Sequence, residues 1–545
     1  MRIWGSANVL TEEEIALIER TALRILEEIG VLIPNDTMLT RFAEVGARVD
    51  RLRRRVRFPA ALVREFVASA EPVSWDEPHI TAYAGAYSRN YIPSGETKAR
   101  PSTLASIVES LVLADHLNTV DGSGCPGVPT EVPAILAPLF MRLLCWRFTE
   151  RKPANCGEVW DTRLCPFVKE MGEAASGLEG AEPGRWAQLA VEMIPPLRFG
   201  VEEAVQYVYF WEHGLPRGVG NMLSAGGSAP ATLAGALALQ LAETFFLNLL
   251  RWAFAGGREV TPGILHGTHS PSAPRSEGAG MGATGTGEAS ARASTGALPL
   301  AGHPCHPPAE RRAGAGEGAA APRPPRGHSL SFGPSVSVLD MKHGMYPYGR
   351  PEIALTHLAM GQLARHYRAD FGSNSFSGDA KVPGCEAGMQ KAFSTIAGIV
   401  AGTRTLGAMG LLSVDEIFSL DQLVIDGEFA SALKRLARGF TVNEETLAYD
   451  VIQAVGPGGI FTDQMHTVTH YREEHWQPQL FSREMLGTWL REGAKTDLDK
   501  AREVCAEARE THHPKGIKDE TVAELLKVIA AAAKHFSVRM PKWPF

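Results

Sequence analysis

Three short segments hold the residue types that could carry out chemistry, namely residues 226–235, 378–381 and 466–470. The first is rich in glycine and other small residues, the second reads Gly-Asp-Ala-Lys, and the third reads His-Thr-Val-Thr-His. In each segment, glycines or an isolated polar cluster follow an apolar run. A barrel enzyme places its reactive groups in this way, at the ends of its strands. The pattern therefore predicts an active site assembled from strand ends.

Asp379 and Lys381 offer a carboxylate and an ammonium group directly after an apolar run. They are two residues apart, so in an extended chain their side chains point the same way. Two roles stay open at this point. The two side chains form an ion pair that orients a loop, or Lys381 binds a carboxylate of the substrate.

Histidine and glutamate residues supply the other candidates. His466 and His470 are four residues apart, so a helix would place both on one face, at a spacing compatible with a metal. No third ligand follows nearby in the sequence, and we predict no metal site. Glu158 and Glu243 are candidate buried carboxylates. Glu243 stands in an apolar helix and needs a partner there, for which a hydrogen bond in the core is favoured over catalysis.

The bulk composition limits the class of protein. The chain has 545 residues, of which 44% are hydrophobic and 21% charged, enough for a large core. A formal net charge of −7 gives no reason to expect nucleic acid or an anionic membrane as a partner. The seven cysteines are scattered and form no CxxC pair. We therefore expect no disulfide framework and a cytoplasmic location.

The longest apolar stretch, residues 229–256, is interrupted by Gln240, Glu243, Asn248 and Arg251. A membrane span needs about 20 nearly uncharged residues. We therefore expect a buried helix that packs against a sheet. The first eight residues contain no apolar run of the kind that a signal peptide has.

The elements that must position these residues follow from the periodicity. Residues 1–100 are predicted to form a mainly helical N-terminal segment with short strands at its end, and a capping box at Thr11 starts its first helix. From residue 101 onward, short apolar runs alternate with long helices, which indicates βα units and a parallel sheet. The predicted fold class is α/β: a (β/α)8 TIM barrel over residues 101–463 and a helical C-terminal extension over residues 464–545. An open sheet is the alternative. The expected strands are residues 118–122, 153–159, 191–195, 217–223, 330–338, 369–374 and 402–412.

Residues 266–329 differ from the rest of the chain. They contain no Val, Ile, Phe, Tyr, Trp, Lys, Asp, Asn or Gln and consist largely of Ala, Gly, Pro, Ser, Thr and Arg. Such a stretch cannot bury enough apolar surface to offset its ordering entropy. We predict a disordered insertion that lies outside the barrel. The His-Pro-Cys-His run at residues 303–306 is interpreted as chance in a biased segment.

Residues 229–243, 378–381 and 455–470, in this order and at this spacing, resemble the trimethylamine methyltransferase family. The resemblance implies a TIM barrel and transfer of a methyl group from a small methylated amine to the cobalt of a corrinoid protein. It implies no tightly bound cofactor, because the corrinoid comes with the partner protein. This chain has no pyrrolysine, so it resembles the branch that acts on quaternary amines such as glycine betaine. A homo-oligomer stays open.

The resemblance and the residue types together give a set of candidate site residues. A tetraalkylammonium is bound by aromatic faces and a nearby carboxylate, and a corrin ring needs small residues where it approaches. Each candidate aromatic near a strand end is more readily explained by ordinary packing than by a role as a cage wall. These aromatics are Phe199, Phe332, Tyr346, Tyr348, Phe371 and Phe376. Catalytic roles are expected for Asp379, Lys381 and His466. Substrate contacts are expected from Phe332, Tyr346, Phe376, Glu386 and Glu158. Corrinoid approach is expected at Gly226, Gly227, Gly378 and Gly410. The barrel mouth is expected to be lined by residues 224–228, 332–335, 373–381 and 407–410.

Residues 384–390 depart from the family pattern, which usually has an acidic residue, then Gln-Ala-Gly-Tyr-Glu. Gly384, Glu386, Met389 and Gln390 stand where the family has Asp, Gln, Tyr and Glu. This rearrangement leaves two alternatives beside a methylamine methyltransferase. One is the same fold acting on a different methyl donor. The other is a catalytically impaired homologue that still docks a corrinoid protein.

Overall fold

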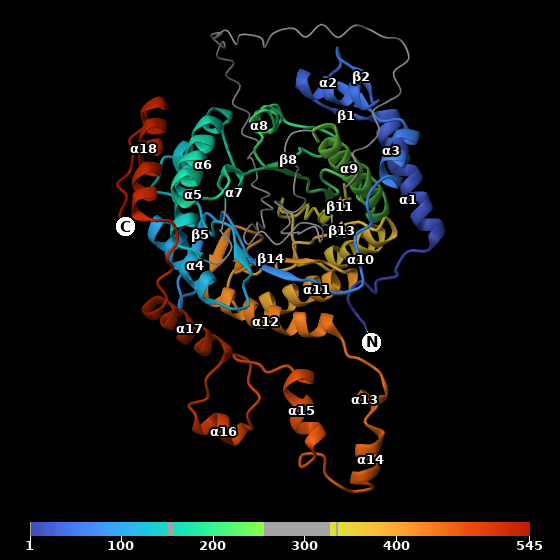
Figure 1. Cartoon of the computed structure of the whole chain (residues 1–545), viewed down its shortest axis with the longest axis vertical. Coiled ribbons are helices and arrows are strands. Elements are labelled where there is room, and N and C mark those ends of the chain that lie inside the picture. The colour runs from blue at the N-terminus through green and yellow to red at the C-terminus, as the bar shows by residue number, and fades with distance from the viewer. Residues whose placement is uncertain (1, 151–155, 256–327, 334–335) are drawn as a thin grey trace.

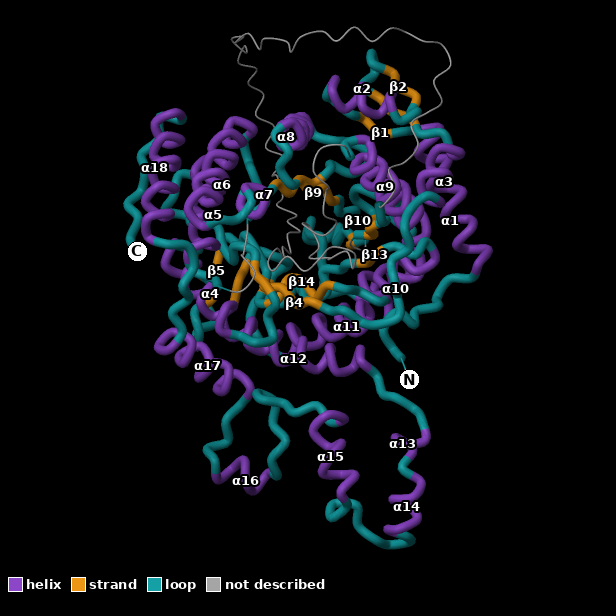
Figure 2. The backbone as a smooth tube through the Cα atoms, viewed as in Figure 1, coloured by secondary structure: helices purple, strands orange, loops and turns teal. Residues whose placement is uncertain are grey.

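The computed structural model of the chain describes residues 2–150, 156–255, 328–333 and 336–545. Its body is mixed α/β. Short strands, most of them parallel, lie toward the centre, and long helices surround them (Figures 1 and 2).

The N-terminal segment begins as predicted. Helix α1 (Glu12–Arg24) starts at Thr11, which forms a capping box with Glu14, and the chain continues in a wider helical turn over Ile25–Ile29 that ends at Gly30. A small antiparallel sheet in the order β1–β3–β2 follows, with two helices. Their bounds are β1 (Val31–Leu32), α2 (Asp36–Glu44), β2 (Arg48–Asp50), β3 (Arg55–Arg57) and α3 (Ala60–Ala68).

Seven central strands pair in parallel within three ladders. The ladders have the orders β14–β4–β7, β8–β9 and β11–β13. Single main-chain bonds extend them: Ala190 donates to the carbonyl of Gly157 at 2.8 Å, and Arg404 donates to that of Phe371 at 2.9 Å. The strands are β4 (Thr81–Ala84), β7 (Gly122–Ser123), β8 (Leu189–Glu192), β9 (Arg217–Gly220), β11 (Ser331–Phe332), β13 (Asp370–Phe371) and β14 (Thr405–Met409).

Strand β4 shows that the parallel core begins earlier in the chain than predicted. The sequence analysis began the barrel at residue 101, but β4 pairs in parallel with both β14 and β7. Its residues Thr-Ala-Tyr-Ala are all buried and too few to show a period, so the sequence does not distinguish them from a short strand outside the core. Part of the expected strand 153–159 and nearly all of residues 266–329 lie outside the described residues.

Helices cover the outside of these strands (Figure 1). Their order along the chain alternates with the strands, as the βα pattern predicts. Short 3-10 turns precede two of them, at Ala134–Leu136 and Thr162–Leu164. The side chain of Thr103 caps the start of helix α4. The helices are α4 (Leu104–His116), α5 (Ala137–Arg147), α6 (Cys165–Glu179), α7 (Pro183–Trp186), α8 (Val201–Glu212), α9 (Leu233–Ala253), α10 (Pro351–His366), α11 (Cys385–Ala401) and α12 (Leu420–Arg438).

Helix α9 has the length and apolar composition of a membrane span, and it is the one such helix among the described residues. Most of its side chains are buried, and it packs against α1, α2 and α10. The expectation of a buried core helix for this stretch is confirmed.

Two smaller sheets form a rim just beyond the carboxyl ends of the central strands. The first has the order β15–β16–β5–β6, and the second is the parallel pair β10 and β12. Because β5, β10, β12 and β15 each follow a central strand along the chain, the rim lies where βα-barrel enzymes carry their sites. The rim strands are β5 (Asn90–Ile92), β6 (Arg100–Pro101), β10 (Ser224–Ala225), β12 (Ser337–Val338), β15 (Leu411–Leu412) and β16 (Ile417–Ser419).

Residues 464–545, the predicted C-terminal extension, are mainly helical, but short helices already begin at residue 444, within the range predicted for the barrel. Helix α17 packs on α12 and α4, and α18 packs on α6 and α5. The short helices before them project away from the body at the bottom of Figure 1. The helices are α13 (Glu444–Leu447), α14 (Tyr449–Val455), α15 (Met465–Glu474), α16 (Leu486–Arg491), α17 (Asp497–Thr511) and α18 (Asp519–His535).

Candidate active site

Two carboxyl groups meet at the carboxyl end of neighbouring core segments. Glu192 is the last residue of β8, and Glu158 follows Gly157, whose carbonyl accepts the amide of Ala190 in the same strand. Burial and then the nearby charge of Glu158 raise the pKa of Glu192 to about 8. Among the described residues, no cation acts on Glu192 to offset this. Because no protein cation offsets the shift of Glu192, this position favours a positively charged ligand.

Tyrosine and aspartate side chains complete this group. Burial raises the pKa of Tyr87 well above its ordinary value, and the charges of Glu158, Asp415 and Glu192 and the hydroxyl of Tyr348 raise it further. Each of these four side chains therefore lies close enough to Tyr87 to act on its charge. Tyr87 follows β4, and Asp415 lies between β15 and β16, so the group draws on several strand ends. We call these five residues the acidic–aromatic cluster.

A buried arginine holds the backbone beneath the cluster. The guanidinium of Arg142, which is fully buried on α5, donates to the carbonyl of Glu158 at 2.9 Å and to that of Gln188 at 3.2 Å. The thiol of Cys156 donates to the Glu158 carboxylate over 3.1 Å. The guanidinium thus ties Glu158 to the start of β8, which fixes where Glu158 stands relative to Glu192.

Gly220, the last residue of β9, leaves room for the Glu192 carboxylate. A Cβ atom at this position would lie 2.8 Å from Oε1 of Glu192. The carboxylate therefore rests on the bare backbone of the neighbouring strand, and any side chain at residue 220 would move it.

Asp379 supports the cluster through the backbone. Its carboxylate accepts the amide of Tyr348 at 2.7 Å and that of Gly349 at 3.0 Å, which sets the position of Tyr348. Lys381 takes a different partner, donating to the hydroxyl of Ser413 at 2.7 Å, and that hydroxyl donates to Glu416 at 2.6 Å. The structure therefore gives the two side chains separate partners instead of a mutual ion pair.

Gln390 holds the loop that carries Asp379. Its side-chain oxygen accepts the amides of Asp379 at 2.7 Å and Ala380 at 3.0 Å, and its nitrogen donates to Glu386 at 3.2 Å. Glu386 is exposed at the start of α11. Within residues 384–390, which depart from the family pattern, Gln390 therefore has a structural role, because it holds the loop of Asp379.

The expected aromatic residues lie in different environments. Phe332 is fully buried, with its ring 5.7 Å from that of Tyr367, and Phe376 is fully buried against Phe429 at 6.0 Å. Both belong to the packed core. Tyr346 is 36% exposed and lies over Gly227 on the rim.

The four expected glycines divide into two pairs. Gly226 and Gly227 are exposed on the rim after β10. Gly378 and Gly410 are buried, and a Cβ would meet Gln390 at 3.1 Å in the first case and the ring of Phe418 at 2.9 Å in the second. Their bare backbone therefore serves internal packing, because Gln390 and Phe418 occupy the space beside them.

His466 stands apart from the cluster. It lies on α15, in the projecting part of the molecule, with its ring centroid 4.4 Å from that of His470 (Figure 1). The described residues contain no group of three or more His, Cys, Asp or Glu arranged to hold a metal ion. Glu243 accepts the amide of Leu197 and the side chain of Asn221, each at 2.7 Å, as expected for a core hydrogen bond.

Comparison with known proteins identifies the family. The family model described as trimethylamine methyltransferase matches residues 2–291 and 325–536, which is most of the chain. The chain belongs to the trimethylamine methyltransferase family. The expectation from the sequence motifs is confirmed. The match omits residues 292–324, within the low-complexity stretch that lies outside the described residues.

Curated relatives of two kinds resemble this family member. The chain is 22% identical to a trimethylamine methyltransferase of Desulfitobacterium hafniense, over 97% of this chain and 94% of the relative. It is 24% identical to a glycine betaine methyltransferase of the same species, over 97% of each chain. A trimethylamine methyltransferase of Methanosarcina mazei is 32% identical over 212 residues, which cover 38% of this chain and 42% of that relative.

Sequence reasoning missed most of the acidic–aromatic cluster. It selected Glu158 but passed over Glu192, although Glu192 is a carboxylate within a predicted strand of this methyltransferase family member. That signal could have been used. Tyr348 was among the candidate aromatics near strand ends. Tyr87 and Asp415 carry no local signal, because loops that are distant in sequence bring them near the other members.

Proposed function

We propose that this protein transfers a methyl group from a methylated amine, in particular a quaternary one, to the Co(I) centre of a corrinoid protein. The acidic–aromatic cluster carries the proposal. Glu158 and Glu192 supply carboxyl groups, of which Glu192 ionises when a cation binds, and Tyr87 and Tyr348 supply aromatic rings, at the ends of the core strands. This is the chemistry that attracts a tetraalkylammonium group. The two relatives that match the whole chain are named for trimethylamine and glycine betaine.

A quaternary amine suits a site of this composition. When a carbon–nitrogen bond of a tetraalkylammonium breaks, the electron pair stays on nitrogen and a neutral tertiary amine leaves. No proton has to be supplied, so the cluster needs no general acid. Its tasks are to hold the cation and to position the methyl group, and positioning contributes strongly to the rate of such a step. The corrinoid supplies the nucleophile, its Co(I) ion.

The rim offers a surface for the corrinoid partner. Gly226 and Gly227 are exposed there, beside the partly exposed ring of Tyr346. Small residues allow a flat macrocycle to approach the backbone. Gly378 and Gly410 are buried and lie outside this surface.

We further infer a closed (β/α)8 barrel and a cytoplasmic enzyme. The parallel pairing of β14 with β4 joins a late strand to the first strand of the core, which is what ring closure requires. The segment around Gly157, bonded to β8, supplies the eighth position between β7 and β8.

The direct test is methylation of free cob(I)alamin under anoxic conditions. The protein is mixed with glycine betaine, tetramethylammonium, choline or trimethylamine, and methylcobalamin is followed by its absorbance. We expect turnover with a quaternary amine. Glu192→Gln should lower it about 10²-fold, the effect of removing one preorganised electrostatic group. Glu212→Gln, an exposed carboxylate at the end of α8, is the matched control and should leave the rate unchanged.

Two results would contradict the proposal. No methyl transfer from any amine, also with a cob(I)alamin-loaded corrinoid protein as acceptor, would favour the docking-only alternative. Transfer from a different methyl donor, insensitive to Glu192→Gln, would remove the acidic–aromatic cluster from the mechanism.

A further inference from the structure

Residues 440–472 form a projecting arm that contains α13, α14 and most of α15 (Figure 1). This stretch is described throughout, and none of its side chains is buried. A segment of this kind has no core of its own. It nevertheless carries ten large apolar side chains that are each more than one third exposed: Phe440, Val442, Leu447, Tyr449, Ile452, Ile460, Phe461, Met465, Val468 and Tyr471.

The arm is anchored where it leaves and rejoins the body. It leaves from the end of α12, and the returning chain is held on the same helix. Oε1 of Glu428 accepts three successive amides, from Gln479 to Phe481, at 2.8–3.2 Å. Arg435 donates to the carbonyl of Glu474 at 2.9 Å, and Trp476 donates to Ser431 at 3.1 Å. The arm is therefore a hairpin with a fixed base.

The helices of the arm are too short to be stable alone. They contain four, seven and ten residues. Isolated helices shorter than about 12–15 residues are marginal in water, and helices in proteins gain most of their stability by packing an apolar face. The apolar side chains of the arm consequently need a surface supplied from outside the arm.

The same chain carries an unpartnered apolar stripe near the base of the arm. Met389, Phe393 and Ile396 on α11 are 58%, 56% and 43% exposed, and their spacing places them on one helix face. Helices α11 and α12 lie along the edge of the body from which the arm projects (Figure 1), and α11 packs on α12, the helix from which the arm leaves. Arm and stripe therefore occupy one edge of the molecule.

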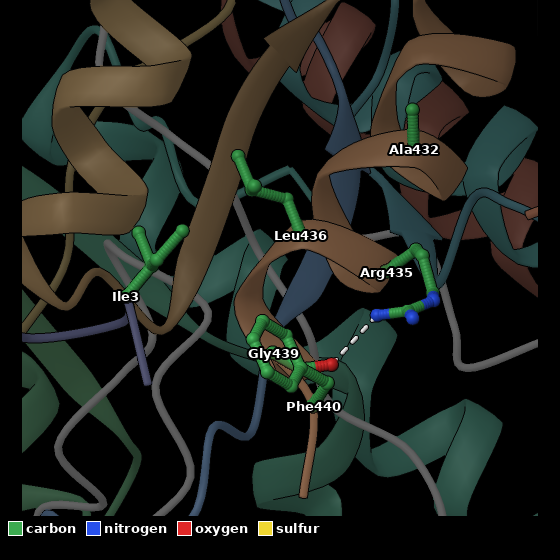
Figure 3. A pocket seen from close by; sticks show the side chains of 6 residues that line it. All are labelled: Ile3, Ala432, Arg435, Leu436, Gly439 and Phe440. Carbon is green, nitrogen blue, oxygen red and sulfur yellow. Dashed lines mark hydrogen bonds between the residues drawn. The ribbon is translucent and has the colours of Figure 1, made fainter. Parts of the chain in front are cut away.

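An apolar hollow lies at the base of the arm. It has a volume of about 310 Å³, and Figure 3 shows the aromatic ring of Phe440 and the guanidinium of Arg435 at its border. Its other lining residues are mostly aliphatic. They are Ile3, Ala432, Leu436 and Gly439.

We propose that the occupant of these surfaces is a second copy of this chain, and that two copies exchange arms around a twofold axis. Each arm lies on the α11 stripe and the basal hollow of the other copy. A twofold interface uses the same patch on both subunits, so donor and acceptor surfaces must stand on one chain, as they do here. The arm has 33 residues, slightly more than the roughly 20–30 residues that one partner contributes to a standard interface.

The exchange also relocates His466 and His470. Helix α11 begins at Cys385, directly after the loop that carries Asp379 and Lys381. An arm that lies along α11 of the neighbour brings these histidines to the rim of that neighbour's core strands.

Mass in solution tests the proposal without reference to activity. We expect sedimentation equilibrium to give twice 58.8 kDa for the wild type at micromolar concentration. Val468→Asp on the arm and Phe393→Asp on the stripe should each weaken the dimer at least about 100-fold, because a carboxylate would enter an apolar contact. Leu17→Asp is the matched control, since Leu17 on α1 is 56% exposed, like Phe393, and should leave the dimer intact. Circular dichroism checks that each variant is folded.

Cross-linking between two tagged copies identifies the contact itself. In a Cys385→Ser background, one copy carries Val468→Cys and the other Phe393→Cys, and a short bismaleimide should join them only in the mixture. A monomeric wild type overturns the proposal. So does a dimer that survives Val468→Asp, and a dimer that survives Phe393→Asp removes the stripe as the acceptor. If the protein is a monomer and its arm binds a corrinoid protein, the arm is a surface for that partner and the proposed dimer is wrong.

Discussion

Glu192 carries its raised pKa because a carboxyl group at the end of β8 is buried beside a second carboxyl group. At pH 7 it is mostly neutral in the free protein, since its pKa is about 8. A cationic ligand favours the ionised form, so binding below pH 8 must release a proton. The affinity of the site for a quaternary ammonium should therefore increase as the pH rises toward 8 and level off above it.

This pH dependence can be measured by calorimetry with tetramethylammonium. We expect Kd to be about 50-fold lower at pH 8 than at pH 6, and Glu192→Gln to bind weakly with a flat profile. The sign for folding is opposite. The unfolded carboxyl ionises near its ordinary pKa, so the stability contributed by this group falls as the pH rises through the window up to about 8. A wild-type affinity that is equal at both pH values would contradict the assignment.

Gly220 provides a test that leaves every charged group in place. Gly220→Ala puts a methyl group where the Glu192 carboxylate rests, 2.8 Å from Oε1. The carboxylate must move, and we expect methyl transfer to fall about tenfold or more with little change in stability, because small displacements of a positioned group reduce rates strongly. Gly177→Ala on α6, where nothing lies within 4 Å, is the control. Equal kcat/KM for Gly220→Ala and wild type would show that this contact is unimportant.

Asp379 acts on the site through the backbone that it holds. Asp379→Ala frees the amides of Tyr348 and Gly349, and we expect methyl transfer to decrease roughly 10²-fold while the fold stays intact. Asp379→Asn keeps one oxygen acceptor and should retain part of the activity. This graded response separates a positioning residue from a group that reacts directly, and a complete loss in both variants would speak against it.

Site residues that follow an apolar run could be predicted from the sequence. Site residues that are brought into place by loops distant in sequence could not. Asp379, Lys381 and Glu158 follow apolar runs, so the sequence could select them for the strand ends. Their partners Tyr348, Ser413 and Cys156 follow from the arrangement of loops in space. Phe332 and Phe376 have the residue type of cage walls, but their burial against other aromatic rings is a property of the packed core.

At the scale of elements, helices α11 and α12 are joined by a buried ion pair. Nζ of Lys391 lies 2.5 Å from the Asp426 carboxylate, and both side chains are almost fully buried. Burial lowers the pKa of Lys391 and raises that of Asp426, and each charge opposes the shift of the other. The carboxylate also accepts the amide of Gly410, so the pair connects the helix layer to the rim after β14.

Removing one partner of this pair should be costly. Lys391→Met leaves Asp426 buried without its cation, and we expect a loss of about 3–5 kcal/mol in the free energy of unfolding, measured with urea. The double variant Lys391→Met with Asp426→Leu should recover much of this loss, since a buried pair can be replaced by apolar residues of similar volume. Additive losses in the double variant would contradict this account.

The element order was largely predictable because periodicity and caps are local. Thr11 and Gly30 bound the first helical segment as the sequence indicates. That β4 belongs to the parallel core could not be predicted. Its pairing with β14 is a long-range contact, and its four buried residues do not reveal it. The position of α15 away from the core could not be predicted from the sequence either. The spacing of His466 and His470 indicates only that they share a helix face.

At the scale of the whole molecule, the family and the α/β class followed from motifs and alternation. The arm of residues 440–472 could not be predicted in this way. The sequence shows that these residues are apolar, but it does not show that they lack packing partners. If two copies exchange arms, activity should depend on protein concentration. We expect the specific activity of Val468→Asp to fall relative to Leu17→Asp near the dissociation constant of the dimer. The same specific activity at all dilutions would separate assembly from catalysis.

The pairing of β4 with β14 constrains how this protein is made. Thr81 in β4 pairs with Thr405 in β14. The N-terminal tail also bonds to residues that are synthesised late, because Trp4 donates to the carbonyl of Thr403 and Ala7 to that of Val400. During synthesis on the ribosome, the first core strand leaves the exit tunnel long before this partner exists. The early half of the nascent chain must then stay soluble with one open strand edge, which is a situation that invites aggregation. Expression of this protein should therefore respond to chaperones that shield nascent chains, and fragments that stop before Thr405 should be recovered as insoluble material.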